Sequence, residues 1–281
     1  MLDPSRAPHI CKWRMSDGYL VAGRIWRGGS DATPILYLHG IQSHGGWYAG
    51  SASLLSENGA TVILPDRRGS GLNAAARGDV PSLDRWFLDI DEIVAAETGG
   101  SERKLDIVGV SWGGKLALAW AIRRPLRVRR LLLIAPGIWP RVDVDRRTRL
   151  RIALALFRGG GATFAIPLSD SALFTNNPDG RTFIACDEKK LTHATARFLY
   201  FNTHLDRIVR RVRPGQLRVP TTVFLAAADR IIDNERTAQW FDKRFSGAAD
   251  VQILHGSHSL EFEQDTTAFL CALRSWRDKT P

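Results

Sequence analysis

Three polar residues that lie far apart in the chain, Ser111, Asp229 and His258, have the types and the order that covalent acyl transfer requires. A serine hydroxyl becomes a nucleophile when a histidine takes its proton, and a carboxylate must then hold the histidine ring. Ser111 lies in Gly109-Val110-Ser111-Trp112-Gly113, the Gly-x-Ser-x-Gly pattern of a nucleophile elbow. The predicted chemistry is attack by the Ser111 hydroxyl on a carbonyl carbon.

The segments on either side of Ser111 support the elbow. The apolar run Leu105–Gly109 predicts a buried strand, and the Ala/Leu-rich run Gly113–Arg123 predicts a helix. Glycines at both ends of the pattern leave room where strand and helix crowd together, and the sharp turn strains the serine backbone. The order GVSWGGK matches neither the dinucleotide fingerprint GxGxxG nor a phosphate loop ending in GK[ST]. A glycine-rich turn with an incidental serine is the alternative.

Two late segments supply the acid and the base. Asp229 ends the apolar run TTVFLAAAD, and His258 lies in the loop after VQILHG. Their rivals are Asp233, which precedes a helical run and fits a helix cap, and His255, whose place at a strand end favours a structural role. The HxxH spacing lacks an HExxH arrangement and a clustered carboxylate, so neither a metal nor a cofactor is predicted.

Stabilising the tetrahedral intermediate takes two backbone N–H donors. One is predicted at Trp112, the residue after the nucleophile. The other is predicted in the loop after PILYLHG, at Ile41, with Gln42 as the second candidate and as a substrate contact. In the same region, His39 and Asp66 of LPDRRGSGLN are predicted to hold turns through hydrogen bonds and not to do chemistry.

These residues need a scaffold, and the periodicity indicates an α/β fold. Helix-like stretches alternate with short apolar runs, several of them apolar on both faces, as in the central strands of a covered parallel sheet. The predicted strands are Tyr19–Trp26, Ile35–His39, Thr61–Pro65, Leu105–Gly109, Leu131–Ala135, Thr221–Ala227 and Asp250–Leu254. The predicted helices are Trp47–Asn58, Leu83–Thr98, Gly113–Arg123, Glu235–Phe245 and Glu261–Trp276.

One interval breaks this alternation. From Gly137 to about Pro220 the sequence is arginine-rich and helix-leaning, with no clear core strand. That interval is too long for a plain loop and predicts a helical lid or cap over residues 137–215. The length of 281 residues suits one large domain, so residues 1–281 are expected to form a single α/β domain with the lid inserted in it.

Composition narrows the class of protein. With 44% hydrophobic and 24% charged residues the chain is an ordinary globular protein, and its net charge is +10. The arginine clusters carry no aromatic interleaving or nucleic-acid motif, so nucleic acid is not a predicted partner. A solvated surface explains them, and peripheral contact with an anionic membrane stays open. Three dispersed cysteines and a charged N-terminal stretch without an apolar core predict a cytoplasmic protein.

Four blocks give the chain a resemblance to a known family: LHGIQSHGGWY, PDRRGSGLN, GVSWGG and ADRIID…GSHSLEFE. With the segment LFTNNPDGRTFIACDEKKLTHATARFLY, they resemble the α/β-hydrolase superfamily, in its monoacylglycerol lipase, lysophospholipase and serine-aminopeptidase-like branch. The resemblance implies a mostly parallel sheet covered by helices on both faces. It also implies Ser111 as nucleophile, Asp229 as acid and His258 as base, with oxyanion amides at Ile41 and Trp112.

The predicted function is hydrolysis of carboxylic esters through an acyl-serine intermediate. The expected partner is a small acyl ester, either acylglycerol-like, lysophospholipid-like or short-chain. Acyl transfer and thioester hydrolysis use the same acyl-serine and stay open. A non-catalytic binding protein on this fold would show a damaged triad or oxyanion loop, and the sequence has every element in place.

Overall fold

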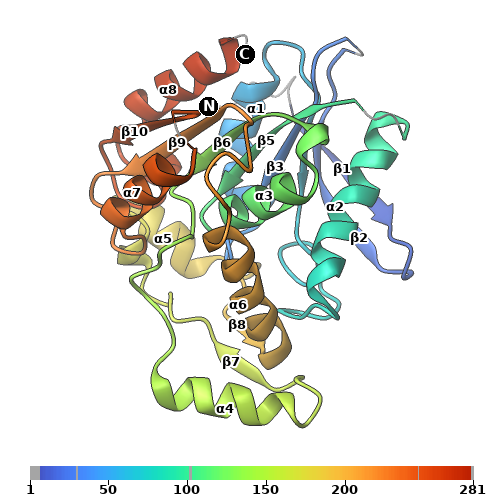
Figure 1. The fold of residues 1–281 in the computed structure, drawn as a ribbon, viewed down its shortest axis with the longest axis vertical. Coiled ribbons are helices and arrows are strands. Elements are labelled where there is room, and N and C mark those ends of the chain that lie inside the picture. The colour runs from blue at the N-terminus through green and yellow to red at the C-terminus, as the bar shows by residue number, and fades with distance from the viewer. Residues whose placement is uncertain (1–6, 30, 101–102, 246, 280–281) are drawn as a thin grey trace.

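The structure, a computed structural model, describes residues 7–29, 31–100, 103–245 and 247–279, so both ends of the predicted 1–281 domain lie outside the described residues. Its centre is an eight-stranded sheet in the order β1-β2-β4-β3-β5-β6-β9-β10 (Figure 1). The strands are β1 (His9–Arg14), β2 (Leu20–Trp26), β3 (Ile35–Leu38), β4 (Val62–Pro65), β5 (Leu105–Val110), β6 (Val128–Ile134), β9 (Thr221–Ala226) and β10 (Ala249–Leu254).

The sheet is parallel from β4 to β10, and β2 pairs antiparallel with both β1 and β4. All residues of β3, β4 and β5 are buried, as strands covered on both faces require. The seven predicted strands are therefore confirmed to within a few residues at their ends. Strand β1 was not predicted, because its sequence HICKWR is mostly exposed at the sheet edge and buries little besides Trp13.

Helices lie on both faces of the sheet, and α2 and α3 stand in front of it in Figure 1. The helices that connect the sheet strands, and the last helix, are α1 (Ala49–Ser56), α2 (Leu83–Thr98), α3 (Trp112–Arg123), α7 (Asn234–Phe245) and α8 (Thr267–Asp278). The predicted start of the last helix at Glu261 is wrong. Leu260–Phe262 forms the short 3₁₀-helix η5, and α8 begins at Thr267, whose N–H is capped by the Asp265 carboxylate at 2.9 Å.

The segment between β6 and β9, residues 135–220, is called the insert. It contains α4 (Arg146–Leu156), β7 (Thr163–Ala165), η4 (Ser171–Leu173), α5 (Pro178–Cys186), β8 (His193–Thr195) and α6 (Ala196–Arg210). Strands β7 and β8 pair only with each other, so no strand of the insert joins the main sheet. Helix α6 packs on α3 and also contacts α4. Helix α4 lies at the end of the molecule far from both termini (Figure 1).

The strand order reverses beside β3. The chain passes from β3 to β4 on one side and returns to β5 on the other. In open α/β sheets the crevice outside the carboxyl ends of the strands at such a reversal is where ligands bind. The segments that follow β3 and β5 contain Ile41 and Ser111, and those that follow β9 and β10 contain Asp229 and His258.

Candidate active site

Ser111 occupies a strained turn between β5 and α3. Its backbone has φ 53° and ψ −119°, a left-handed conformation that a residue with a side chain rarely adopts. A Cβ atom on Gly113 would lie 2.2 Å from the Leu38 carbonyl oxygen, and one on Gly109 would lie 2.7 Å from the Gly113 carbonyl oxygen. The two glycines are therefore what allows α3 to start against the sheet directly after the serine.

The structure brings the three predicted catalytic side chains together. His258 Nε2 lies 3.0 Å from Ser111 Oγ, and His258 Nδ1 lies 2.8 Å from Asp229 Oδ2. The other oxygen of the carboxylate, Asp229 Oδ1, accepts the N–H groups of Ile231 and Ile232 at 2.8 and 2.9 Å. Because an ionised carboxylate only accepts hydrogen bonds, Nδ1 carries the proton and Nε2 is free to accept from the serine hydroxyl.

The rival residues lie elsewhere. Asp233 caps α7 by accepting the N–H of Arg236 at 3.1 Å, and His255 is exposed at the end of β10. Among the described residues, no group of three or more His, Cys, Asp or Glu side chains could hold a metal ion.

Ile41 and Trp112, the predicted oxyanion donors, lie beside the cavity that Ser111 faces. Both residues line the same cavity as Ser111, and within the described ranges neither N–H has a protein acceptor. The trans peptide that joins Gly40 to Ile41 fixes the direction of the Ile41 N–H, because its carbonyl and its N–H point in opposite directions. A side chain that fixes the position of the Gly40 carbonyl oxygen therefore also fixes the direction of the Ile41 N–H.

Two buried side chains hold that oxygen. His39 Nδ1 donates to it at 2.8 Å, and Arg67 Nη1 donates at 3.2 Å, while Arg67 Nη2 donates to the Ile41 oxygen at 2.8 Å. Burial holds the pKa of His39 well below its usual range, so the ring is neutral and its Nε2 accepts the Arg67 N–H at 2.8 Å. Burial also lowers the pKa of Arg67 to about 9. His39 is structural, as predicted.

Asp66 has the predicted turn role as well. Its carboxylate accepts the N–H groups of Gly45 at 2.6 Å and Leu72 at 2.8 Å, and it pairs with Arg24. Arg67, in contrast, was missed. The available signal was an arginine two residues after a buried strand, where its charge must find partners inside the protein.

A cavity of about 700 Å³ opens in front of Ser111 between the sheet edge and the insert. Near the serine its walls are Trp112, Ile41 and Ile231 from the core, and Ile166 and Leu168 from the insert. Gln42 is buried but does not line this cavity, and its carbonyl oxygen accepts the Leu191 N–H at 2.7 Å. Its role as a substrate contact stays a prediction.

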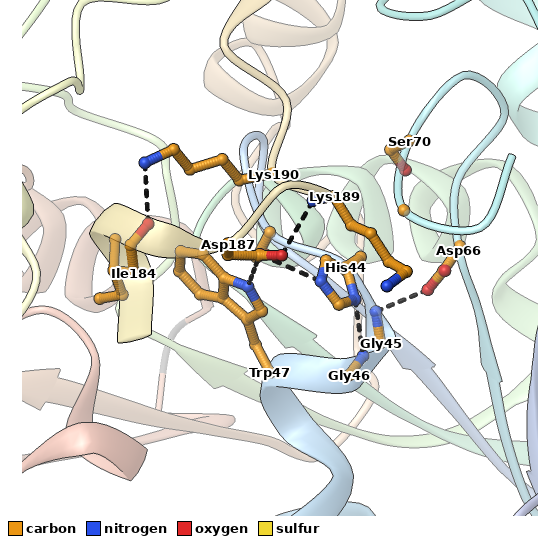
Figure 2. Close-up of polar contacts among 12 residues, drawn as sticks. His44, Gly45, Gly46, Trp47, Asp66, Ser70, Ile184, Asp187, Lys189 and Lys190 are labelled. Atoms are coloured by element: carbon orange, nitrogen blue, oxygen red, sulfur yellow. Dashed lines mark hydrogen bonds and ion pairs between the residues drawn. The ribbon is translucent and has the colours of Figure 1, made fainter. Parts of the chain in front are cut away.

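The insert is fastened to the core next to this site. Figure 2 shows the Asp187 carboxylate, at the end of α5, against Trp47 of the short 3₁₀-helix η2 (Gly45–Tyr48) and against His44, which caps that helix. Asp187 Oδ2 accepts from His44 Nε2 at 3.1 Å and from Trp47 Nε1 at 2.6 Å. The Phe174 ring of the insert packs edge-on against the Trp47 ring at 5.9 Å and against the His258 ring at 6.0 Å.

Comparison with known proteins gives consistent results. The model of the family described as serine aminopeptidase, S33 matches residues 30–265. Phospholipase YtpA of Bacillus subtilis is 25% identical over 226 residues, which cover 77% of this chain and 83% of that protein. Monoglyceride lipase of Rattus norvegicus is 21% identical over 276 residues, 96% of this chain and 89% of that protein.

Comparison with a solved structure identifies the fold. The soluble variant of monoglyceride lipase from Saccharomyces cerevisiae, in complex with a substrate analog, superposes with a TM-score of 0.84 at 17% identity, over 99% of this chain and 97% of that one. This likeness confirms the predicted α/β-hydrolase fold. Because the family model spans most of the chain, the protein belongs to the S33 serine aminopeptidase family of α/β-hydrolases.

Proposed function

We propose that this lipase- and esterase-type hydrolase cleaves carboxylic esters through an acyl-serine intermediate on Ser111. The observation that carries the proposal is the His258 ring, which bridges Ser111 Oγ at 3.0 Å and Asp229 Oδ2 at 2.8 Å. His258 is the general base and then the general acid. Asp229 keeps the ring in the tautomer whose Nε2 accepts a proton.

The proposed steps balance in protons and bonds. Ser111 Oγ attacks the ester carbonyl carbon as His258 Nε2 takes the hydroxyl proton, and the N–H groups of Ile41 and Trp112 stabilise the oxyanion. His258 then gives this proton to the departing alcohol, which leaves an acyl-serine. Water attacks the acyl-serine carbonyl while His258 takes a proton from it. Collapse of the second intermediate releases the carboxylic acid and returns the proton to Ser111.

The proposed substrates are acylglycerol-like, lysophospholipid-like or short-chain esters. The apolar walls around Ser111 suit an acyl chain, since burial of each CH₂ group contributes about 0.8 kcal/mol. The similar proteins, a phospholipase and monoglyceride lipases, support the same class of substrate.

We propose that residues 137–215 act as the lid of this site. The insert supplies much of the cavity wall, and its Phe174 touches the catalytic histidine. Within the insert, α6 packs on α3, whereas α4 contacts mainly α6, so α4 is the part of the lid with the fewest ties to the core. Shortened variants that lack α4 should keep activity on short esters and lose the preference for long acyl chains.

Peripheral contact with an anionic membrane is proposed for α4 and the residue after it. This segment bears the exposed side chains of Leu150, Leu154 and Phe157, with exposed fractions of 63%, 53% and 90%, beside exposed arginines. Apolar side chains flanked by arginine are typical of interfacial helices. Among the described residues, no helix combines the length and apolarity that a membrane span requires. Vesicle binding should therefore weaken with added salt and with Phe157→Ser.

The test is hydrolysis of p-nitrophenyl esters from acetyl to palmitoyl. Ser111→Ala should lower kcat by roughly 10⁴- to 10⁶-fold, while Ser275→Ala, an exposed serine on α8, should leave it unchanged. A Ser111→Ala rate within tenfold of the wild-type rate would refute the proposed nucleophile. The acyl length with the highest kcat/KM separates a short-chain esterase from a lipase-like enzyme.

The alternative outcomes concern the acceptor and the leaving group. Adding short alcohols or thiols to the assay partitions the acyl-serine, so a new ester product would identify an acyltransferase. Faster cleavage of a thioester than of the matched oxygen ester would identify a thioesterase. Binding of esters without any turnover would identify a binding protein on this fold.

A further inference from the structure

The cavity in front of Ser111 has two chemically distinct regions. The region next to the serine is apolar. The other region is lined by α6 and by Lys115 of α3 and is rich in charge. Lys115 follows Ser111 by four residues, which places it about 6 Å further along α3 and on the same side of the helix.

Lys115 is a buried cation at the floor of this polar region, with a side-chain exposed fraction of 4%. Its ammonium donates to Asp206 Oδ1 at 2.6 Å and to Asn202 Oδ1 at 2.7 Å. Asn202 Oδ1 also accepts from Trp112 Nε1 at 2.8 Å. An ammonium has three N–H donors and an amide nitrogen has two, so one donor of Lys115 and both donors of Asn202 are left without a described protein acceptor.

Cations outnumber acids along the cavity wall. The wall contains Lys115, Arg149, Arg207, Arg210 and Arg211 against Asp143 and Asp206, an excess of three positive charges. Asp143 is already paired with Arg149 at 2.6 Å, and Asp206 with Lys115.

Two arginines of this wall are not paired with any acidic residue that the structure describes. Arg207 and Arg211, one turn apart at the end of α6, are exposed, and neither forms an ion pair with a described residue. Arginine binds carboxylate and phosphate oxygens through two parallel N–H groups. This end of the cavity therefore offers an anion both charge and donors.

We propose that the α6 end of the cavity is a specificity site for an anionic group, so that the preferred ester carries a carboxylate or a phosphate near the scissile bond. Arg207 and Arg211 bind its oxygens at the cavity mouth, and Asn202 and Lys115 supply N–H donors at the floor. The apolar region next to Ser111 takes the rest of the chain. This inference rests on the proposed ester hydrolysis and names the class of ester.

The experiment compares two matched pairs of substrates in the full-length protein. The first pair is p-nitrophenyl hexanoate and the p-nitrophenyl half ester of adipic acid, which places the charge on the acyl part. The second is hexanoylglycerol and hexanoylglycerol phosphate, which places it on the alcohol part. The measured quantity is the ratio of kcat/KM for the anionic ester to kcat/KM for its neutral partner.

In at least one pair the wild-type ratio should be about ten or more, the size of one charge-assisted contact. The pair that shows this ratio tells whether the anion is on the acyl or the alcohol part. The double variant Arg207→Gln/Arg211→Gln should bring the ratio close to one. Asp206→Asn should raise it, because the paired carboxylate no longer neutralises Lys115. The control Arg213→Gln/Arg218→Gln removes the same two charges from exposed arginines that do not line the cavity, and should leave the ratio unchanged.

Three results would overturn the proposal. A wild-type ratio of one or below in both pairs would mean that the cavity does not select an anion. An equal drop with Arg213→Gln/Arg218→Gln and with Arg207→Gln/Arg211→Gln would mean that only the overall positive charge matters. A ratio that does not rise with Asp206→Asn would mean that Lys115 does not contribute to anion binding. Ser111-dependent cleavage of the neutral esters would leave the proposed function standing in each case.

Discussion

The guanidinium carbon of Arg67 lies 4.6 Å from the centre of the Trp112 ring, so one buried cation contacts both sides of the candidate oxyanion site. Its N–H groups hold the Gly40 and Ile41 carbonyl oxygens, and its face stacks on the side chain of the second amide donor. Without Arg67, His39 would be the single donor to the Gly40 oxygen that remains among the described residues. Arg67 is thus a positioning residue for both N–H groups.

Replacing Arg67 by methionine should lower kcat by about 10- to 100-fold, with a smaller effect on KM. Methionine keeps the apolar length but cannot hold the two carbonyl oxygens, so the Ile41 N–H loses its fixed direction. Removal of a whole oxyanion donor typically costs about 10²- to 10³-fold, and misalignment should cost less. Steady-state kinetics on a p-nitrophenyl ester gives the split between kcat and KM.

The matched control is Arg68→Met. Arg68 is also buried, but it pairs with Asp89 at 2.8 Å and with Asp17 at 3.0 Å, away from the oxyanion loop. This variant should lose stability and retain most of its kcat below its melting temperature. Equal kcat losses in the two variants would show that Arg67 acts only through general stability.

Asp229→Asn should lower kcat by about 10⁴-fold at neutral pH, as loss of the carboxylate does in other triads. The asparagine amide must use its oxygen for the N–H groups of Ile231 and Ile232 or for His258, and its NH₂ then faces the other partner. Asp233→Asn is the control, since asparagine caps a helix as well as aspartate does, and its activity should stay within about twofold. Comparable losses at both positions would argue against Asp229 as the orienting acid.

Much of this site could be predicted because its signals are local. The run LDIVGVSWGG specifies a buried strand, a glycine turn and a helix start within ten residues, and the order of Ser111, Asp229 and His258 along the chain follows from the fold. Periodicity found the buried strands for the same reason, since a parallel strand covered on both faces is a continuous apolar run.

What could not be predicted depends on contacts between distant segments. Arg67 and Gly40 are 27 positions apart in the sequence, and Lys115 and Asn202 are 87 positions apart. The residues next to each of them in the sequence do not indicate its hydrogen-bond partner. Strand β1 is missed because an exposed edge strand needs no apolar alternation. Gln42 was chosen by its distance from the strand end, but its main chain pairs with Leu191 of the insert.

Glu261 links the histidine loop to α1, and it should give the protein a pH-dependent stability. Its carboxylate accepts the N–H of Ser51 at 2.9 Å and the Ser51 hydroxyl at 2.6 Å, and burial raises its pKa to about 7. The folded state then holds a proton that the unfolded state, with an ordinary pKa near 4.5, releases earlier. The free energy of unfolding should therefore fall as the pH rises from about 4.5 to about 7.

Melting temperatures of the wild type and of Glu261→Gln between pH 5 and 8 test this expectation, with the pH values chosen at roughly half-unit steps across the window. The neutral amide of the variant cannot lose a proton, so the substitution Glu261→Gln should flatten the profile, and the wild type should lose stability relative to the variant as the pH rises. Glu188→Gln, at an exposed position, is the control and should leave the profile unchanged. Parallel profiles for all three proteins would show that Glu261 does not titrate in this window.

The strain at Ser111 can be measured separately from its chemistry. Both Ser111→Ala and Ser111→Gly remove the hydroxyl and its bond to His258, but only alanine keeps the Cβ atom that the φ of 53° disfavours. Relief of such strain is worth about 1–3 kcal/mol, and the extra chain entropy of glycine opposes it by about 0.5–1 kcal/mol. Ser111→Gly should therefore be more stable than Ser111→Ala by about 1 kcal/mol in denaturant unfolding.

In the control pair, the difference in stability between the glycine and alanine variants should have the opposite sign. At Ser275, on the exposed side of α8, glycine should be less stable than alanine by about 1 kcal/mol, because alanine is the better helix former. If glycine is the less stable residue at position 111 as well, the elbow stores no strain and its glycines serve only to make room. If the glycine variant is the more stable one at position 111, the backbone of the wild-type serine is strained. The packing of β5 and α3 against each other then maintains this strained conformation.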